Sequence, residues 1–109
     1  VYRYKEIVCE PEIKMGLLEL DQGAHYPAHS HPAREIYHVL AGEARWDVDG
    51  EECFVRAGMT VCHEPMAVHS FQNTGAETLR LLWIWWARKG KQKDLRIPAS
   101  LLIPILSGD

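Results

Sequence analysis

Four side chains with metal-binding chemistry dominate the middle of the chain. His29 and His31 are separated by a single residue, Glu35 follows four residues later, and His69 lies more than thirty residues farther on. Residues two apart on an extended chain project from the same face, so His29 and His31 point the same way. Three imidazoles and one carboxylate suit one divalent transition metal ion, which we expect to be Zn, Fe, Mn, Ni or Co.

These four residues can meet only if the chain folds back on itself. Pro32 and a short loop let Glu35 turn back toward the two histidines, whereas His69 joins them only when strands curl round, as in a barrel. A metal site of this kind usually leaves a coordination position open, as catalytic metal sites do. A lone histidine is more often a core or surface residue, but this combined pattern favours a metal site.

The surrounding elements read as short strands separated by turn residues. Asp49-Gly50 between two apolar runs is the strongest hairpin signal in the chain. Regular strands at this spacing indicate an all-β barrel or sandwich. Predicted strands cover residues 13–20, 35–40, 43–48, 51–55, 60–63, 68–72 and 79–87, with a final edge strand at 101–106 after a solvated basic loop at 88–93.

Length and composition limit the function classes. The 109 residues allow one domain, and a net charge of -3 argues against a nucleic-acid partner. No run approaches 18 apolar residues, so we expect no membrane association, and the lack of a leader pattern predicts a cytoplasmic protein. The odd cysteine count predicts three partly buried thiols rather than a disulfide framework: Cys9, Cys53 and Cys62.

The histidine pattern resembles the cupin superfamily through both of its motifs. The first motif is matched at every spacing by Gly23, His29, His31, Glu35 and Gly42. The second is matched by Gly58, His69 and Asn73, with Glu64 and Met66 where the family has Pro and Gly. The resemblance implies an all-β fold, a small single-domain cupin β-barrel (a double-stranded β-helix or jelly roll) over residues 1–109, with motif 1 at 23–42 and motif 2 at 58–73.

A narrower resemblance links the chain to the cupin-type dimethylsulfoniopropionate lyases. It rests on the stretches Tyr26-Pro27-Ala28-His29-Ser30-His31, Glu35-Ile36-Tyr37 and Gly42-Glu43-Ala44-Arg45-Trp46. By this resemblance His31, Glu35 and His69 hold the metal, and His29 is a further ligand or a pocket residue. Tyr37 lies in or beside the coordination sphere and is the candidate catalytic base, while Tyr26 assists it or binds substrate. The implied partner is a small-molecule carboxylate that carries a sulfonium group.

A sulfonium cation favours an aromatic wall. Phe71 shares the inward face of His69, and Trp83 and Trp85 lie on one face of their strand, which the sequence does not orient. Packing in the core or at a homodimer interface is an equally good interpretation of these tryptophans, and we expect a homodimer. Of the other histidines, His25 is expected on a turn, His38 faces away from the metal, and His63 has no assignment.

Two other function classes fit the same ligands. One is a different metal-dependent cupin enzyme, either an iron oxygenase acting on a small thiol or diketone or an isomerase, in which Tyr37 orients the substrate. The other is a non-catalytic cupin that binds a small molecule, for which a missing ligand is expected. An oxygenase consumes oxygen and requires iron, whereas a lyase requires neither oxygen nor a redox cycle.

Overall fold

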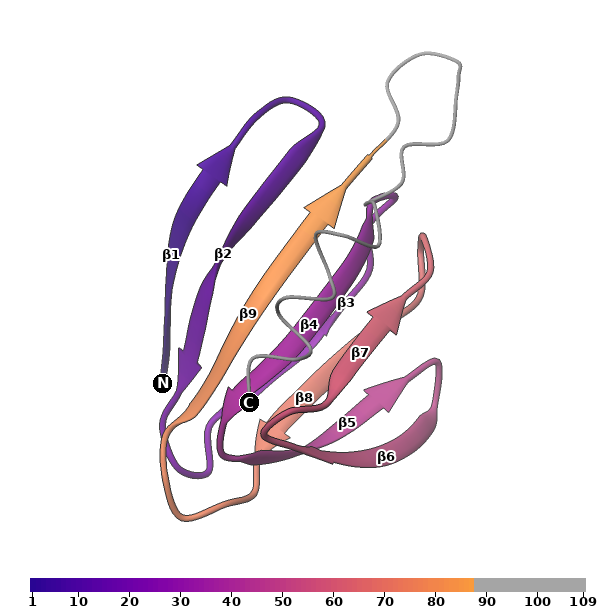
Figure 1. Ribbon diagram of the computed structural model, residues 1–109. Helices are drawn as coiled ribbons and strands as arrows, with labels where there is room; N and C mark the ends of the chain where they lie inside the picture. The colour runs from indigo at the N-terminus through magenta and orange to yellow at the C-terminus, as the bar shows by residue number, and fades with distance from the viewer. Residues whose placement is uncertain (88–109) are drawn as a thin grey trace.

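The computed structural model describes residues 1–87, which form nine β-strands and contain no helix (Figure 1). The strands are β1 (Tyr2–Cys9), β2 (Ile13–Leu20), β3 (His25–His29), β4 (Arg34–Ala41), β5 (Glu43–Val48), β6 (Glu51–Arg56), β7 (Thr60–His63), β8 (His69–Asn73) and β9 (Leu79–Trp86). The all-β prediction is confirmed. The loop predicted at 88–93 and the strand predicted at 101–106 lie outside the described residues. Within residues 1–87 no helix is long and apolar enough to span a membrane.

The strands form two antiparallel sheets that face each other (Figure 1). One sheet has the order β1-β2-β9-β4-β7 and the other the order β3-β8-β5-β6. The β5–β6 hairpin turns at Asp49 and Gly50, both with positive φ of 50° and 87°. Two successive positive φ values match the right-handed twist of the flanking strands, which explains why Asp-Gly predicts this hairpin correctly.

Most strand boundaries were predicted to within one or two residues, but β1 and β3 were not predicted. Strand β1 has no alternation of buried and exposed residues, because nearly all its side chains are exposed on a sheet edge. Strand β3 contains Pro27, which cannot donate a ladder hydrogen bond, and its pairing with β8 is interrupted between Tyr26 and His29. His25 is the first residue of β3 and is exposed, whereas the sequence analysis expected it on a turn.

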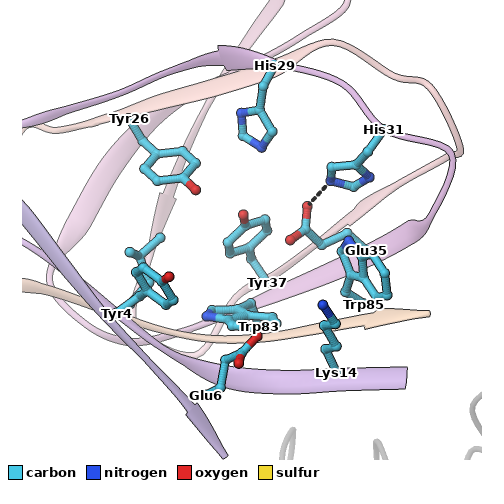
Figure 2. A pocket seen from close by; sticks show the side chains of 11 residues that line it. Tyr4, Glu6, Lys14, Tyr26, His29, His31, Glu35, Tyr37, Trp83 and Trp85 are labelled. Atoms are coloured by element: carbon cyan, nitrogen blue, oxygen red, sulfur yellow. Dashed lines mark hydrogen bonds and ion pairs between the residues drawn. The ribbon is translucent and has the colours of Figure 1, made fainter. Parts of the chain in front are cut away.

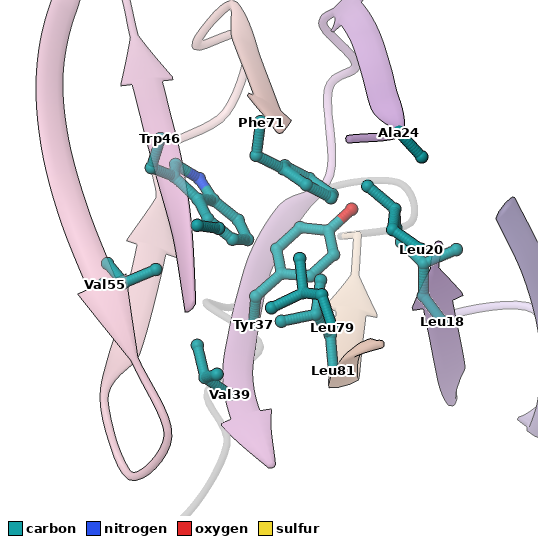
Figure 3. Packing of buried hydrophobic residues seen from close by; sticks show 11 residues of the cluster. Leu18, Leu20, Ala24, Tyr37, Val39, Trp46, Val55, Phe71, Leu79 and Leu81 are labelled. Atoms are coloured by element: carbon teal, nitrogen blue, oxygen red, sulfur yellow. The ribbon is translucent and has the colours of Figure 1, made fainter. Parts of the chain in front are cut away.

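The hydrophobic core lies between the two sheets (Figure 3). On one side Trp46 of β5 stacks on Phe71 of β8, with ring centroids 4.0 Å apart. Buried aliphatic and aromatic side chains of the other sheet pack against this pair: Leu18, Leu20, Tyr37, Val39, Leu79 and Leu81. Two fully buried aromatic rings contribute a large share of the buried apolar area and fix the distance between the sheets.

The second cupin-like motif is held by local hydrogen bonds. The buried amide of Asn73 donates to the carbonyls of Leu20 and Glu77 and accepts from the backbone N–H of Gly75. Met66 stands where the motif has glycine and takes a positive φ of 67°. Its N–H donates to the carbonyl of His31 at 2.7 Å, so the turn before β8 is tied to the segment that carries the first two histidines.

Candidate metal centre

The four predicted ligands come from three strands and one loop. His29 is the last residue of β3, and its Cα pairs with that of His69, the first residue of β8. Glu35 lies on β4 in the opposite sheet, and His31 stands in the short segment between β3 and β4. The site therefore draws ligands from both sheets and lies where their inner faces meet.

The ligand atoms are close enough to share one ion. All four residues offer a nitrogen or carboxylate oxygen within 4.8 Å of the others. Oε1 of Glu35 lies 3.1 Å from Nε2 of His31 and 3.1 Å from Nε2 of His69. Ligands bound at about 2.0–2.2 Å from one metal ion are roughly 3–3.5 Å apart, so these two separations match a shared ion.

Hydrogen bonds on the far side of each imidazole fix its tautomer. Each Nδ1–H donates to the backbone carbonyl of a residue two positions away, in the pairs His29–Pro27 (2.9 Å), His31–Ala33 (3.1 Å) and His69–Ala67 (2.9 Å). A carbonyl only accepts, so Nδ1 carries the proton of each neutral ring and Nε2 keeps its lone pair. Metal-binding histidines show this same arrangement of an outer hydrogen bond and an inner free nitrogen.

This donor set fits a divalent transition metal ion. Three Nε2 lone pairs and a carboxylate oxygen converge with no proton among them when the rings are neutral. Nε2 of His69 is buried and has no hydrogen-bond partner despite its closeness to Glu35. Buried, electron-rich groups that face one another are unfavourable unless a cation compensates them. The cluster of His29, His31, Glu35 and His69 is therefore consistent with a metal site, as the sequence predicts.

The pKa values of the site keep the ligands in their metal-binding forms. Burial opposes ionisation of Glu35, but the neighbouring imidazoles of His63, His69 and His31 outweigh it and lower the pKa of its carboxyl to about 2. Burial, reinforced by His69, lowers the pKa of His29 below its usual value. At neutral pH the carboxylate is thus ionised and the His29 imidazole is neutral, as metal binding requires.

A cavity of about 270 Å³ opens beside the cluster (Figure 2). Three of the four predicted ligands, His29, His31 and Glu35, lie on its wall. The remaining lining residues come from β1, β2, β3, β4 and β9: Tyr4, Glu6, Lys14, Leu18, Tyr26, Tyr37, Trp83 and Trp85. The cavity is thus a pocket with a polar, ligand-bearing end and aromatic walls.

Both predicted catalytic tyrosines line this cavity. Tyr37 is 2% exposed, and its hydroxyl points toward that of Tyr26 across the cavity (Figure 2). Burial first, and then the charge of Glu35, raises the pKa of Tyr37 well above its usual value. Burial also raises the pKa of Tyr26, with Tyr2 adding to the effect. Both hydroxyls are therefore protonated at neutral pH when no cation lies nearby.

The structure orients the three predicted aromatic wall residues. Trp83 and Trp85 both face the cavity. Phe71 instead lies in the core, where it stacks on Trp46 and on the ring of Tyr26, and it is not among the cavity-lining residues. Its role in the site is therefore indirect, because it supports the position of Tyr26.

Four cavity residues escaped the sequence analysis: Tyr4, Glu6, Lys14 and Leu18. Tyr4 and Glu6 lie on β1, a strand with no recognisable pattern, and Lys14 lies on β2. The ammonium of Lys14 lies 5.1 Å from the ring centroid of Trp85, which indicates a cation–π contact. The sequence predicts that Lys14 lies on a strand, but its contact with Trp85 results from the pairing of β2 with β9, which the sequence does not reveal.

The remaining histidines divide into three environments. His25 is exposed, and Nδ1 of His38 bonds to the Thr60 hydroxyl, away from the cluster. His63 is buried against the cluster, with its ring stacked on His69 at 3.9 Å. Its neighbourhood follows from the pairing of Glu35 with His63 between β4 and β7, a register that the sequence does not reveal.

The prediction about the cysteines was wrong in one respect. Cys9, Cys53 and Cys62 are free and exposed rather than partly buried. All three lie on strands at the sheet edges: β1, β6 and β7. Their side chains therefore project outward, where the general preference of free cysteine for burial does not apply.

Several solved structures have a similar fold, and some of them are described as cupins. The cupin domain of Schizosaccharomyces pombe Cnp3 matches with a TM-score of 0.78 and 18% identity, over 80% of this chain and 65% of that one. A predicted oxalate decarboxylase from Thermotoga maritima matches with a TM-score of 0.76 and 22% identity, over 80% and 81% of the two chains. KdgF from a Halomonas species matches at 0.73 and 18%, over 82% and 81%. At these identities the matches establish the fold alone.

A curated protein is similar to this chain over a short segment. The dimethylsulfoniopropionate lyase DddQ of Ruegeria pomeroyi is 57% identical over 28 residues, which are 26% of this chain and 14% of that protein. The match therefore spans only a small part of the lyase. The family model described as "Cupin domain" matches residues 16–85, a range that contains the four clustered ligands and the surrounding strands. With the two facing antiparallel sheets, this match shows that the chain belongs to the cupin family.

Proposed function

We propose that this cupin is a metal-dependent lyase that cleaves dimethylsulfoniopropionate into dimethyl sulfide and acrylate by β-elimination. The observation that carries the proposal is the pair of tyrosine hydroxyls, Tyr26 and Tyr37, facing each other in a cavity whose wall also holds the metal-ligand cluster. The short but 57% identical match to a dimethylsulfoniopropionate lyase adds support.

His29, His31, Glu35 and His69 would hold the ion. When bound, a divalent ion supplies a Lewis acid for the substrate carboxylate and positive charge that favours the tyrosinate form of a neighbouring tyrosine. The second effect matters because burial and Glu35 raise the pKa of Tyr37. A base must have a pKa near the working pH to remove a weakly acidic proton efficiently.

The proposed elimination needs no oxidant or reductant. Tyr37 oxygen takes a proton from the carbon next to the substrate carboxylate, and the electrons of that C–H bond form the C=C bond of acrylate. The carbon–sulfur bond breaks with its electron pair remaining on sulfur, which leaves as neutral dimethyl sulfide. Tyr26, whose hydroxyl faces that of Tyr37, accepts or shares the proton or orients the substrate.

The charges on the cavity wall suit a substrate with opposite charges at its two ends. Lys14 lies over Trp85, whose Cα pairs with that of the ligand Glu35, so a positive charge stands near the metal end. Glu6 lines the cavity near Trp83, toward Tyr4 (Figure 2). An indole face and a carboxylate both attract a sulfonium, and a cation–π contact contributes about 0.5–2 kcal/mol. We therefore place the substrate carboxylate at the metal end and the sulfonium at the Trp83 end.

The test is headspace gas chromatography for dimethyl sulfide with metal-loaded protein and dimethylsulfoniopropionate. We expect Tyr37→Phe and His69→Ala to reduce dimethyl sulfide release at least 100-fold, because a general base typically accelerates a reaction by about 100-fold or more. His25→Ala and His25→Gln serve as control variants, because the His25 side chain neither lines the cavity nor joins the ligand cluster, and both should retain activity.

Sulfide release that the control variants retain and the site variants lose supports the lyase. No release above the buffer blank from protein that contains bound metal would refute it. Oxygen consumption measured in the same samples after iron loading would then identify an oxygenase, the other enzyme class that the ligand set allows.

A further inference from the structure

His63 occupies an unusual position behind the metal-ligand cluster. Its side chain is fully buried, and its ring stacks on His69 at a centroid distance of 3.9 Å. It is nevertheless not one of the four residues whose ligand atoms come together. A buried imidazole beside a metal site needs a reason, because each ring nitrogen that lacks a partner costs free energy.

One ring nitrogen of His63 has a partner of known polarity. The indole Nε1–H of Trp46 donates to Nε2 of His63 at 2.9 Å, within the buried core. An indole N–H can only donate, so Nε2 of His63 is the acceptor and its lone pair is occupied. The neutral ring must then carry its proton on Nδ1, the nitrogen nearer the cluster, and this nitrogen has no free lone pair for a metal ion.

The other ring nitrogen of His63 points at the ligand carboxylate. Nδ1 lies 3.8 Å from Oε1 of Glu35 and is buried without a hydrogen-bond partner. The neighbouring nitrogens of His31 and His69 approach the same oxygen at 3.1 Å, but their protons are on Nδ1 and bonded to backbone carbonyls. Among the neutral rings around Glu35, His63 alone therefore offers an N–H to this oxygen.

We propose that His63 is a positioning residue, locked as its Nδ1–H tautomer by Trp46, which donates a hydrogen bond to Glu35 and holds that carboxylate in place as a metal ligand. The 3.8 Å distance between Nδ1 of His63 and Oε1 of Glu35 must shorten by about 0.9 Å to reach the usual length of an N–H···O hydrogen bond. The inference depends on the metal site but not on the proposed lyase reaction.

Two substitutions separate this role from simple core packing. His63→Leu removes both hydrogen bonds and keeps an apolar side chain, whereas His63→Gln keeps an amide oxygen for Trp46 and an amide N–H for Glu35. Loss of an outer hydrogen bond to a metal ligand typically weakens metal affinity 10- to 100-fold. We expect a loss of this size for His63→Leu and recovery to within about threefold of the unsubstituted protein for His63→Gln.

Trp46→Phe tests the tautomer lock itself. Phenylalanine keeps an aromatic ring against Phe71 but removes the N–H donor, so we expect about a tenfold loss of affinity by the same principle. Trp86→Phe is the matched control, because Trp86 is also buried but belongs to the separate cluster with Ile36 and Ile84. Affinity is measured for Zn²⁺ by competition with a chromophoric chelator, without any substrate.

A second measurement uses the unsubstituted protein and so does not require any variant to fold. Long-range ¹H–¹⁵N correlation spectra of the metal-free protein report which nitrogen of each histidine carries the proton. We expect His63 to show a protonated Nδ1 and an unprotonated Nε2 at neutral pH. A protonated Nε2 on His63, or equal Zn²⁺ affinity for His63→Leu and His63→Gln, would overturn the proposal while leaving the lyase assay unaffected.

Discussion

At the scale of single residues, the buried histidines make stability depend on pH. Burial is the main cause that lowers the pKa of both His29 and His63 below 6.5, the value for an exposed imidazole. The unfolded chain therefore binds more protons than the folded chain as pH falls below 6.5, and the free energy of unfolding must decrease with falling pH in that range. The lowered pKa of Glu35 contributes in a lower window, since its stabilisation is lost as pH falls from 4.5 toward 2.

We expect the Tm of the metal-free protein to fall between pH 7 and pH 5, measured by circular dichroism with chelator present. His63→Gln should flatten this dependence, because it removes an imidazole whose pKa is lowered by burial. His25→Gln should leave it unchanged, since His25 is exposed. An identical Tm at both pH values in the unsubstituted protein would contradict the assignment of buried, neutral imidazoles.

At the scale of elements, the cavity wall depends on how closely β1, β2 and β9 pack. Gly16 of β2 pairs with Trp83 of β9 and with Glu6 of β1. A Cβ at Gly16 would lie 2.6 Å from Cζ2 of Trp83 and would collide with the carbonyl oxygen of Lys5. Glycine at this position therefore lets the Trp83 indole lie flat against β2 with one face toward the cavity.

Gly16→Ala should destabilise the protein by about 1–3 kcal/mol, the usual cost of overpacking, in a urea unfolding experiment. It should also change the tryptophan fluorescence, because Trp83 must move. The control is Gly75→Ala, where the nearest atoms belong to the flexible side chain of Glu43, and a change below about 0.5 kcal/mol is expected. Equal stabilities of the two variants would show that Trp83 does not depend on Gly16.

The same scale explains what the sequence could predict. The H-x-H-x-x-x-E spacing is local, so His29, His31 and Glu35 could be predicted as one group of ligands from the sequence alone. The contact of His63 with Glu35 depends on the pairing of β4 with β7, and the contact of Lys14 with Trp85 depends on the pairing of β2 with β9. Register between distant strands leaves no local pattern, so these contacts could not be predicted.

Orientation of the Trp-rich strand was open for a related reason. Strand β9 is apolar on both faces, so alternation does not identify its inner side. In the structure Trp83 and Trp85 face the cavity, whereas Trp86 packs with Ile36 and Ile84 in a second cluster. Two of the tryptophans that suggested a dimer interface thus have a place within the chain.

At the scale of the whole molecule, a homodimer remains a prediction, but it now rests on the exposed edge of β1 instead of the tryptophans of β9. Strand β1 is a sheet edge with exposed Tyr2, Tyr4 and Ile7, and exposed edges with apolar side chains favour pairing with another chain. We expect multi-angle light scattering to give twice the chain mass, and Ile7→Lys to shift the mass toward one chain. A monomer mass for the unsubstituted protein would remove the prediction.

Metal binding should stabilise the whole fold, because its ligands join the two sheets. Glu35 belongs to one sheet, and His29 and His69 belong to the other, so an ion on all three resists separation of the sheets. A ligand at 100 times its Kd stabilises the folded state by about 2.7 kcal/mol. For a domain of this size that corresponds to a rise in Tm of roughly 10–20 °C.

Differential scanning calorimetry of Zn²⁺-loaded and chelator-treated protein measures this difference. His25→Ala should show the full rise, since it lies outside the ligand cluster, whereas Glu35→Gln should lose most of it. The neutral amide keeps the shape of the glutamate but lacks the negative charge that attracts the metal cation. A difference between Glu35→Gln and the unsubstituted protein therefore reports metal binding rather than packing. If the loaded and chelated proteins melt within about 2 °C of each other, the cluster does not bind the ion strongly enough to join the sheets, and the metal-dependent function proposed here fails with it.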